Sequence, residues 1–432
     1  MFIQRQKEIE LLNRSYEEPF STIELLQGAS NTGKTALLKE YTKDKEKIYI
    51  ANYEMIRTHF FTSIANIINN HFEEKDVKTV FHDFKEVLSF LSKHDIKEKL
   101  VIIFDDFQNI LKIDKDALSS LTFIWKEILK NKNIQIIIST SIFFDEKSSF
   151  GLEKIINNRI NIEYLSFDAI KSFFPKLTKL DQLYVYSLLG TSPTNLKYYN
   201  INKSFSENIF NLFLSPNAYL FDYGRRVLKN EISDIGTYSS ILYAISLGRI
   251  KIGDIAKFLE VKSTYLTRYI QKLQDMHLIK KVVPIGQNTK NTKYSRYEIV
   301  DNTIRFWFSY IFPNVEKLQF LKVEDVGKLI ENEFISRNVL YCYKKYIKEY
   351  IIKNQKSTFG YMPTCIGPWW DNSDTIDLVA YNNKYITFVQ ILWEEKQIVK
   401  LSYEKLKAIS KKYKTSLDRN YLIVTKNSFF NI

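Results

Sequence analysis

The sequence predicts an α/β protein with a doubly wound parallel sheet, and three observations carry this prediction. A glycine- and lysine-containing loop, residues 28–35, lies between a short apolar run and a segment with helical spacing. Further continuous apolar runs alternate with helical patterns over the first 165 residues. Two of these runs, 100–104 and 134–138, end in polar side chains. Continuous apolar strands alternating with helices are typical of parallel sheets covered on both faces.

The loop has the spacing of a phosphate-binding P-loop. A strand that enters a glycine turn and then a helix directs backbone N–H groups at a polyphosphate, and the helix dipole favours the negative charge. Lys34 is expected to reach the β- and γ-phosphates of a nucleotide, and Thr35 is expected to hold Mg²⁺. The nucleotide-binding residues predicted from the loop are Gly28, Ala29, Ser30, Asn31, Thr32, Gly33, Lys34, Thr35 and Ala36.

The polar side chains at the ends of the two central strands are expected beside this loop. Asp105 follows Leu100–Phe104 and is predicted to be the second group at the Mg²⁺. Asp106 takes the position of a residue that orients the attacking water; it is one methylene shorter than glutamate, so slow hydrolysis is expected. Thr140, or its neighbour Ser139, is a candidate for contact with the γ-phosphate, with a plain strand-to-loop turn as the alternative.

Composition limits the classes of protein that fit. The 432 residues are enough for two to four domains. Two cysteines without metal-ligand spacing exclude a disulfide framework and argue against a structural zinc site. The opening residues do not form a secretory leader and no apolar run reaches the length of a membrane span, so a cytoplasmic protein without a membrane partner is expected.

The positive charge is concentrated in one segment. Residues 235–300 carry eleven Lys and Arg against four Asp and Glu, which is +7 of the total of +13. Helical patterns at 238–248, 251–259 and from Ser263 precede two alternating runs, 279–284 and 294–299. Three helices and a hairpin predict a winged helix-turn-helix, a fold that places a helix in the major groove of DNA. The residues predicted to contact DNA are Lys262, Thr264, Arg268, Lys272, Lys290, Lys293 and Arg296.

Two other interpretations of this segment stay open. Lysine is abundant throughout the chain, so the charge can reflect a general bias of composition. The winged helix can also pack on the nucleotide domain and regulate it, since a fold does not determine a function.

Several motifs together resemble the archaeal-type ATPases, a branch of the AAA-related, signal-transducing NTPases. They are the opening Phe2–Glu8, the P-loop, Asp105–Gln108, Leu189–Leu196 and Asp301–Phe308. The resemblance implies ATP and Mg²⁺ as ligands, a helical lid whose Pro193 packs near the adenine, and Arg5 in the nucleotide site. The chain departs from the family pattern at Asn31, Thr32 and Thr191, and has Asp106 in place of glutamate.

The C-terminal part resembles the restriction-endonuclease-like domain of the same family. The resemblance implies a nuclease site at Glu333 (or Glu331), Asp377 and Gln390, but Thr375, Gln390 and Leu392 stand where the pattern has Glu, Glu and Lys. A hairpin closing at Asn382-Asn383 would place Asp377 opposite Phe388. Without the other charged groups, we expect a nuclease-like fold that has lost its activity.

The predicted order of domains is an ATPase core at 1–165, a helical lid at 166–233, a winged helix at 234–312 and a degenerate nuclease-like domain at 320–432. The leading prediction is an ATPase that acts as a nucleotide-dependent switch, with DNA, a protein or a second copy of the chain as partner. A DNA-binding regulator with structural ATP is the alternative, and a DNA-cleaving enzyme of mobile-element type is disfavoured.

Overall fold

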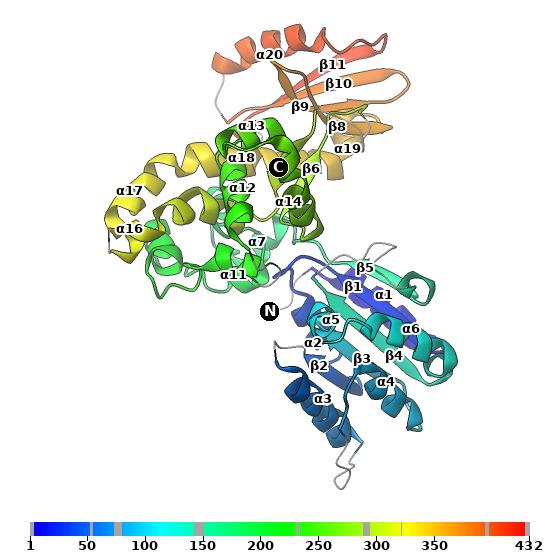
Figure 1. Cartoon of the computed structure of the whole chain (residues 1–432). Coiled ribbons are helices and arrows are strands. Elements are labelled where there is room, and N and C mark those ends of the chain that lie inside the picture. Colours follow the sequence, from blue (N-terminus) through cyan, green and yellow to red (C-terminus); the bar gives the residue numbers. More distant parts are fainter. Residues whose placement is uncertain are drawn as a thin grey trace. The chain divides into compact units, whose positions relative to one another are not determined.

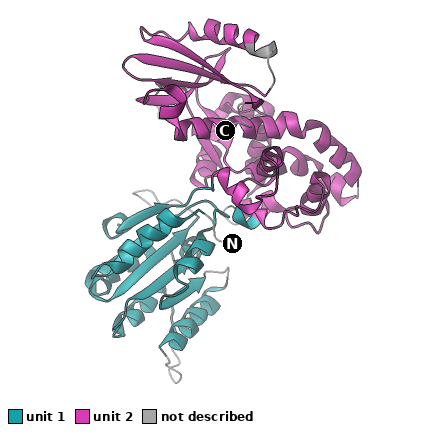
Figure 2. Cartoon of the chain, turned by 180° about the vertical axis from the view of Figure 1, so that it is seen from behind, with its two compact units in different colours: residues 1–165, 192–194 teal, residues 166–191, 195–432 magenta. Residues whose placement is uncertain are grey.

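The computed structural model describes residues 4–51, 55–72, 80–141, 151–229, 232, 234–287, 294–320, 322–393 and 397–427. The chain forms two compact units (Figure 2). Unit 1 contains residues 1–165 with 192–194, and unit 2 contains residues 166–191 with 195–432. In the described ranges, none of the helices combines the length and apolar character needed to cross a membrane.

Unit 1 is built on a five-stranded sheet in the order β2-β3-β4-β1-β5, in which every pairing is parallel (Figure 1). All residues of β1, β3 and β4 are buried, which fits strands covered on both faces. The strands are β1 (Thr22–Gln27), β2 (Lys47–Ala51), β3 (Leu100–Asp105), β4 (Ile134–Thr140) and β5 (Asn158–Asn161).

Two hydrophobic cores on opposite faces of this sheet confirm the doubly wound arrangement. Val101 and Ile103 of β3 pack in one core with α1 and α2, whereas Ile102 and Phe104 pack in the other with α3, α4 and α6. The alternation follows from the two-residue period of a strand. The helices are α1 (Gln6–Glu17), α2 (Lys34–Tyr41), α3 (Arg57–His71), α4 (Phe84–Lys93), α5 (Phe107–Ile113) and α6 (Ala117–Glu127), and short 3₁₀ turns cover Leu129–Asn131 and Leu152–Lys154.

Unit 2 begins with the helices of the predicted lid. They are α7 (Asp168–Phe173), α8 (Lys179–Leu189), α9 (Pro193–Leu196), α10 (Phe205–Ile209), a π-helical turn (Phe210–Leu214) and α11 (Tyr223–Lys229). The first two residues of α9 belong to unit 1.

The basic segment then forms three helices and a two-stranded antiparallel hairpin. Its elements are α12 (Gly236–Ser246), α13 (Ile252–Phe258), α14 (Ser263–Asp275), β6 (Ile279–Val282) and β7 (Arg296–Ile299). The predicted inner face of α14 is buried at Leu266, Ile270 and Leu273. This order of elements is the one expected of a winged helix.

The rest of unit 2 is a helical stretch followed by a four-stranded sheet in the order β11-β10-β9-β8. The helices are α15 (Asn302–Phe306), α16 (Val315–Gln319), α17 (Val323–Phe334), α18 (Leu340–Lys353), α19 (Gln355–Phe359) and α20 (Gln397–Ser410), with π-helical turns at Trp307–Ile311 and Ile335–Val339 and a 3₁₀ turn at Phe312–Asn314. The strands are β8 (Cys365–Trp370), β9 (Thr375–Tyr381), β10 (Tyr385–Ile391) and β11 (Asp418–Val424).

The larger of two hydrophobic cores among the described residues of unit 2 joins Leu188 of α8 to Ile270 of α14, Trp307, Tyr343 of α18 and Leu378 of the C-terminal sheet. A smaller core in the same sheet contains Ile376, Val379 and Phe388. The three segments that the sequence divides therefore share buried surface.

The predicted register of the C-terminal hairpin is wrong by two residues. Phe388 pairs with Val379, and Val389 pairs with Leu378, so the next pair places Gln390 opposite Asp377. The side-chain oxygen of Asn382 accepts the N–H groups of Lys384 and Tyr385, at 2.9 and 2.8 Å. The N–H of Asn382 also donates to the carbonyl oxygen of Tyr385 at 3.0 Å, so the turn lies at residues 383–384, one residue later than the Asn382-Asn383 turn expected from the sequence.

Candidate nucleotide site

The P-loop connects β1 to α2 at the carboxyl edge of the parallel sheet. A Cβ on Gly28 would lie 2.3 Å from the carbonyl oxygen of Ile162, so only glycine fits there. Gly33 has φ +95° and precedes the first residue of α2, and Asn31 has φ +64°. These left-handed residues turn the chain sharply before the helix, which leaves the first N–H groups of α2 directed toward the loop.

Lys34, Thr35 and Asp105 come together as the sequence predicts. The Lys34 ammonium is buried and donates to the carbonyl oxygens of Gly28 and Ala29, at 2.6 and 3.0 Å. Thr35 Oγ1 donates to Asp105 Oδ2 at 2.8 Å. A hydroxyl and a carboxylate at this separation are oxygen ligands of the kind that Mg²⁺ prefers, so the residues fit the metal.

Tyr49 is a neighbour of Asp105 that the sequence analysis missed. Its hydroxyl donates to Asp105 Oδ2 at 2.6 Å. The contact could have been predicted from the sequence only if the strand order had been known. It arises because β2 pairs with β3 and Tyr49 lies two residues from the end of its strand. Asp105 Oδ2 thus accepts two hydroxyl hydrogen bonds.

Asp106 has a left-handed backbone conformation, and its carboxylate accepts a hydrogen bond from a neighbouring side chain. Its φ is +53°, which is uncommon for a residue with a side chain. Gln108 Nε2 donates to Asp106 Oδ1 at 3.1 Å, and Gln108 Oε1 accepts from the N–H of Ser141 at 3.2 Å. Burial, with the charge of Asp105 adding to it, raises the pKa of the Asp106 carboxyl above its ordinary value.

Thr140 lies at the end of β4, next to the start of the P-loop. It pairs with Gln27 in the sheet, and its carbonyl oxygen accepts from the N–H of Gly28 at 3.2 Å. Ser139 is also buried, and its Oγ has no hydrogen-bond partner among the described residues. Both candidates for the γ-phosphate contact therefore border the loop.

Arg5 forms a hydrogen bond to the backbone of the P-loop. Its guanidinium is buried and donates to the carbonyl oxygens of Thr32 and Glu163, at 3.0 and 2.5 Å, and pairs with Glu8 at 3.0 Å. Tyr164 supports the same loop through a 3.3 Å hydrogen bond from its hydroxyl to the carbonyl oxygen of Ser30. Arg5 thus lies in the nucleotide domain's site as a residue that positions the loop backbone.

Residues 192–194 complete the surroundings of the loop. Ser192 Oγ donates to the carbonyl oxygen of Asn31 at 3.0 Å. A Cβ built on Gly33 would lie 3.7 Å from Pro193 Cγ. Although α8 and the last two residues of α9 lie in unit 2, these three residues are part of unit 1.

A P-loop at the carboxyl edge of a doubly wound parallel sheet, with a strand-end aspartate beside its threonine, defines a P-loop NTPase. Comparison with known families narrows this class. Residues 2–199 match an ATPase domain found predominantly in Archaea, and residues 307–409 match a family of archaeal and bacterial proteins of unknown function. Over residues 2–199 the chain is thus similar to the archaeal-type ATPases.

One curated relative matches nearly the whole chain. It is the uncharacterized protein MJECL04 of Methanocaldococcus jannaschii, 27% identical over 425 residues, which are 95% of this chain and 92% of that protein.

Among solved structures, the chain is similar to the Aeropyrum pernix ORC1 protein in complex with DNA, with 14% identity, a TM-score of 0.37, and coverage of 73% of this chain and 95% of that one. It is also similar to a Pyrococcus horikoshii signal transduction ATPase with a tetratricopeptide repeat sensor. There the identity is 14% and the TM-score 0.28, covering 82% of this chain and 52% of that one.

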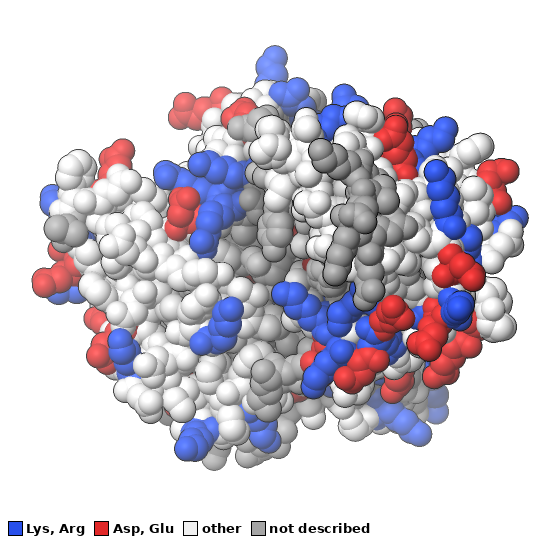
Figure 3. Space-filling view, turned by 90° about the horizontal axis from the view of Figure 1, so that it is seen from below, with Lys and Arg blue, Asp and Glu red and all other residues white. Residues whose placement is uncertain are grey.

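The residues predicted to contact DNA divide into two groups. Lys262, Thr264 and Arg268 are exposed at the start and along the outer face of α14, and Lys272 is half-buried on the same helix. Lys290 and Lys293 lie outside the described residues. On the face shown in Figure 3, Lys and Arg are interspersed with Asp and Glu, so this face carries no continuous patch of positive charge among the described residues.

Arg296 packs against the C-terminal sheet. Its guanidinium lies 4.2 Å from the centre of the Trp370 ring and donates to Thr375 Oγ1 at 3.2 Å. The same edge of the hairpin contacts β8 through its backbone, because the N–H of Ile285 donates to the carbonyl oxygen of Pro368 at 2.8 Å. The hairpin is thus attached to the C-terminal sheet.

The three residues of the implied nuclease site are not all brought together. Asp377 and Gln390 are adjacent, with Gln390 Nε2 donating to Asp377 Oδ2 at 2.9 Å. Glu333 pairs with Arg337 at 3.0 Å on α17 and the following turn. Among the residues that the structure describes, no three His, Cys, Asp or Glu side chains gather as a metal site.

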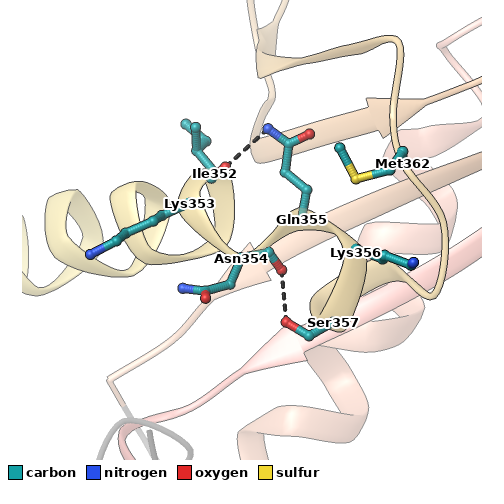
Figure 4. A pocket seen from close by; sticks show the side chains of 7 residues that line it. All are labelled: Ile352, Lys353, Asn354, Gln355, Lys356, Ser357 and Met362. Carbon is teal, nitrogen blue, oxygen red and sulfur yellow. Dashed lines mark hydrogen bonds between the residues drawn. The ribbon is translucent and has the colours of Figure 1, made fainter.

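A surface depression where α18 gives way to α19 offers no catalytic group (Figure 4). Gln355 and Ser357 donate there to the backbone carbonyls of Ile352 and Asn354. The other residues that line it are Lys353, Lys356 and Met362.

Proposed function

We propose that the protein binds ATP with Mg²⁺ at the P-loop, hydrolyses it slowly, and uses the nucleotide state to change the exposure or partners of unit 2. Lys34 would bind the phosphates, and Thr35 and Asp105 would hold the metal. When bound, Mg²⁺ would neutralise charge that develops on the phosphates. The observation that carries the proposal is the membership of residues 192–194 in the nucleotide domain.

The residues before and after segment 192–194 lie close to the same polar cluster of unit 2, which consists of Asp301, Asn302 and Thr303. Gly190 lies at φ +59°, where an added Cβ would be 3.0 Å from Asp301 Oδ1. On the other side, Asn195 Nδ2 donates to Thr303 Oγ1 at 3.2 Å. In the proposed switch, a movement of Ser192 and Pro193 with the P-loop would be passed to Asp301–Thr303.

The polar cluster also reaches α18 of the C-terminal region. The ammonium group of the half-buried Lys345 donates to the carbonyl oxygen of Val300 at 2.7 Å and to Asn302 Oδ1 at 3.3 Å. Tyr223 donates to Asp301 Oδ2 at 3.1 Å. Because buried polar networks have few alternative arrangements, a change at one member favours a concerted change of the others.

Hydrogen exchange with ADP and with a non-hydrolysable ATP analogue tests the switch. We expect the amides of residues 186–196 and 301–305 to change their exchange rates between the two nucleotides. Identical exchange in these segments, with both nucleotides bound, would argue against the switch while leaving nucleotide binding intact.

Slow hydrolysis rests on Asp106. Its carboxylate is short and is already engaged by Gln108, so it is poorly placed to take a proton from water. We expect Asp106→Glu to raise the steady-state ATPase rate several-fold, with Asp116→Glu, on an adjacent loop, as a control. An unchanged rate in Asp106→Glu would count against this role.

A second candidate function is DNA binding through α14, supported by the exposed Lys262, Thr264 and Arg268. Phosphate contacts by such residues produce a steep salt dependence. DNA affinity should be measured across a salt series with ATP, with ADP and without nucleotide. A DNA affinity that depends on the nucleotide would show that the nucleotide switch controls DNA binding. Equal affinity in all three conditions would favour a DNA-binding regulator with structural ATP.

A further inference from the structure

A buried carboxylate in the C-terminal sheet accepts hydrogen bonds from several donors among the residues that the structure describes. Asp377 in β9 is 4% exposed. Its Oδ2 accepts from Lys344 Nζ at 3.0 Å, from Gln390 Nε2 at 2.9 Å and from the N–H of Ile391 at 2.9 Å. Three donors are more than an oxygen usually accepts, so this atom has no free capacity.

The second oxygen of the same carboxylate faces two ammonium groups. Lys344 Nζ lies 3.2 Å and Lys348 Nζ 3.6 Å from Asp377 Oδ1. The two lysines are four residues apart on α18 and therefore project from one face of this helix. Their side chains are 40% and 29% exposed, so the carboxylate is buried while its cations reach the surface.

The helix that supplies these lysines is held firmly in place. Lys345, between them, bonds to Val300 and Asn302 on another side of α18. Tyr343 donates to the carbonyl oxygen of Leu392 at 3.2 Å. The two ammonium groups are thus delivered to Asp377 by a helix with contacts on several sides.

We propose that Lys344 and Lys348 take the place of a divalent cation at Asp377, so that the C-terminal sheet is stabilised by the chain's own ammonium groups and binds no divalent metal there. A divalent ion needs several oxygen ligands. The groups bonded to Asp377 are instead two ammonium groups, which repel such an ion, and two N–H groups, which have no lone pair to offer it. This inference is independent of the proposed ATP switch.

Manganese binding by the full chain without nucleotide tests the proposal. We expect isothermal titration calorimetry to show the same Mn²⁺ binding for the wild type and for Asp377→Asn, so that no binding depends on Asp377. The triple variant Lys344→Ser, Lys348→Ser, Gln390→Glu removes both ammonium groups and restores a second carboxylate. It should bind Mn²⁺ at least about tenfold more tightly than the wild type and show a Mn²⁺-dependent rise in Tm.

A matched control removes the same charge elsewhere. In Lys328→Ser, Lys356→Ser, Gln390→Glu, two exposed lysines are lost while Lys344 and Lys348 remain, and we expect no gain of Mn²⁺ binding. If the first triple variant folds and binds no metal, the lysines are not what excludes it, and the proposal fails. If that variant does not fold, the wild type still decides: Asp377-dependent Mn²⁺ binding to it would overturn the proposal, and absence of such binding supports it.

Discussion

Asp105 and Asp377 are both buried aspartates on sheet strands, and they differ in the groups that surround them. Asp105 accepts from the hydroxyls of Thr35 and Tyr49 and from the N–H of Asp106. Asp377 accepts from the Lys344 ammonium group, an amide and a backbone N–H, and forms an ion pair with Lys348. A hydroxyl can rotate and present its oxygen to a metal, whereas an ammonium group has only donors. The hydrogen-bond partners of a carboxylate, more than its burial, decide whether it can bind a metal ion from solution.

The largest expected effect is at Asp105. Asp105→Asn removes the charge that would hold Mg²⁺, and we expect the ATPase rate to fall about 1,000-fold. Asp377→Asn makes the same chemical change in the other unit and should leave the rate within about twofold of the wild type. Steady-state phosphate release measures both. Equal losses in the two variants would break the comparison.

A third buried carboxylate is Glu24 in β1. Burial raises its pKa to about 7, although the neighbouring Ser15, Asn158 and Thr22 favour the charged form. Between pH 4.5 and 7 the folded state then binds more protons than the unfolded state, so stability falls as the pH rises through this window. Glu24→Gln should stabilise the protein by about 3 kcal/mol above pH 7 and have little effect below pH 4.5.

Urea unfolding at pH 4.5 and pH 8 measures this effect for Glu24. Glu40→Gln, an exposed residue of α2, is the matched control and should show no such difference. A pH-independent effect of Glu24→Gln would mean that Glu24 is ionised in both states.

Asp377→Asn should also reduce stability, because it leaves two ammonium groups without their carboxylate. Losses of 3–5 kcal/mol are usual for fully buried pairs; Lys344 and Lys348 are partly exposed, so we expect about 2 kcal/mol. Urea unfolding of the nucleotide-free chain measures it. A loss that disappears in the Lys344→Ser, Lys348→Ser background would assign it to these ion pairs, and a loss that persists would not.

The smallest expected effect is at Ser192. Ser192→Ala removes one hydrogen bond to the carbonyl oxygen of Asn31, worth about 1 kcal/mol. We expect about fivefold weaker ATP binding in a fluorescent-nucleotide titration, and a smaller difference in hydrogen exchange between ADP and the ATP analogue. Ser240→Ala, on α12, should change neither; equal effects of the two variants would remove Ser192 from the proposed transmission.

Local patterns predicted the nucleotide domain well and the C-terminal site poorly. The meeting of Thr35 and Asp105 follows from strand ends that share one edge of a parallel sheet, which apolar runs reveal. The pairing of Gln390 with Asp377 depends on a turn formed by the Asn382 side chain, which moves the register by two residues. The contact of Lys344 with Asp377 joins a helix to a strand 33 residues later, and periodicity says nothing about such partners. Arg296 on Trp370 was missed for the same reason.

The continuous core of unit 2 limits how this protein can change over evolutionary time. Tyr343 and Ile347 of α18 are covered in the same core as Leu378, Val389 and Ile391 of the sheet. A truncation before β8 would expose these helix residues to water and weaken the packing of the lid. Point mutations can therefore replace the charged groups of the sheet one at a time, but loss of the whole sheet would carry the lid with it. The sheet is therefore retained for its packing against α18, whichever charged groups its strands carry.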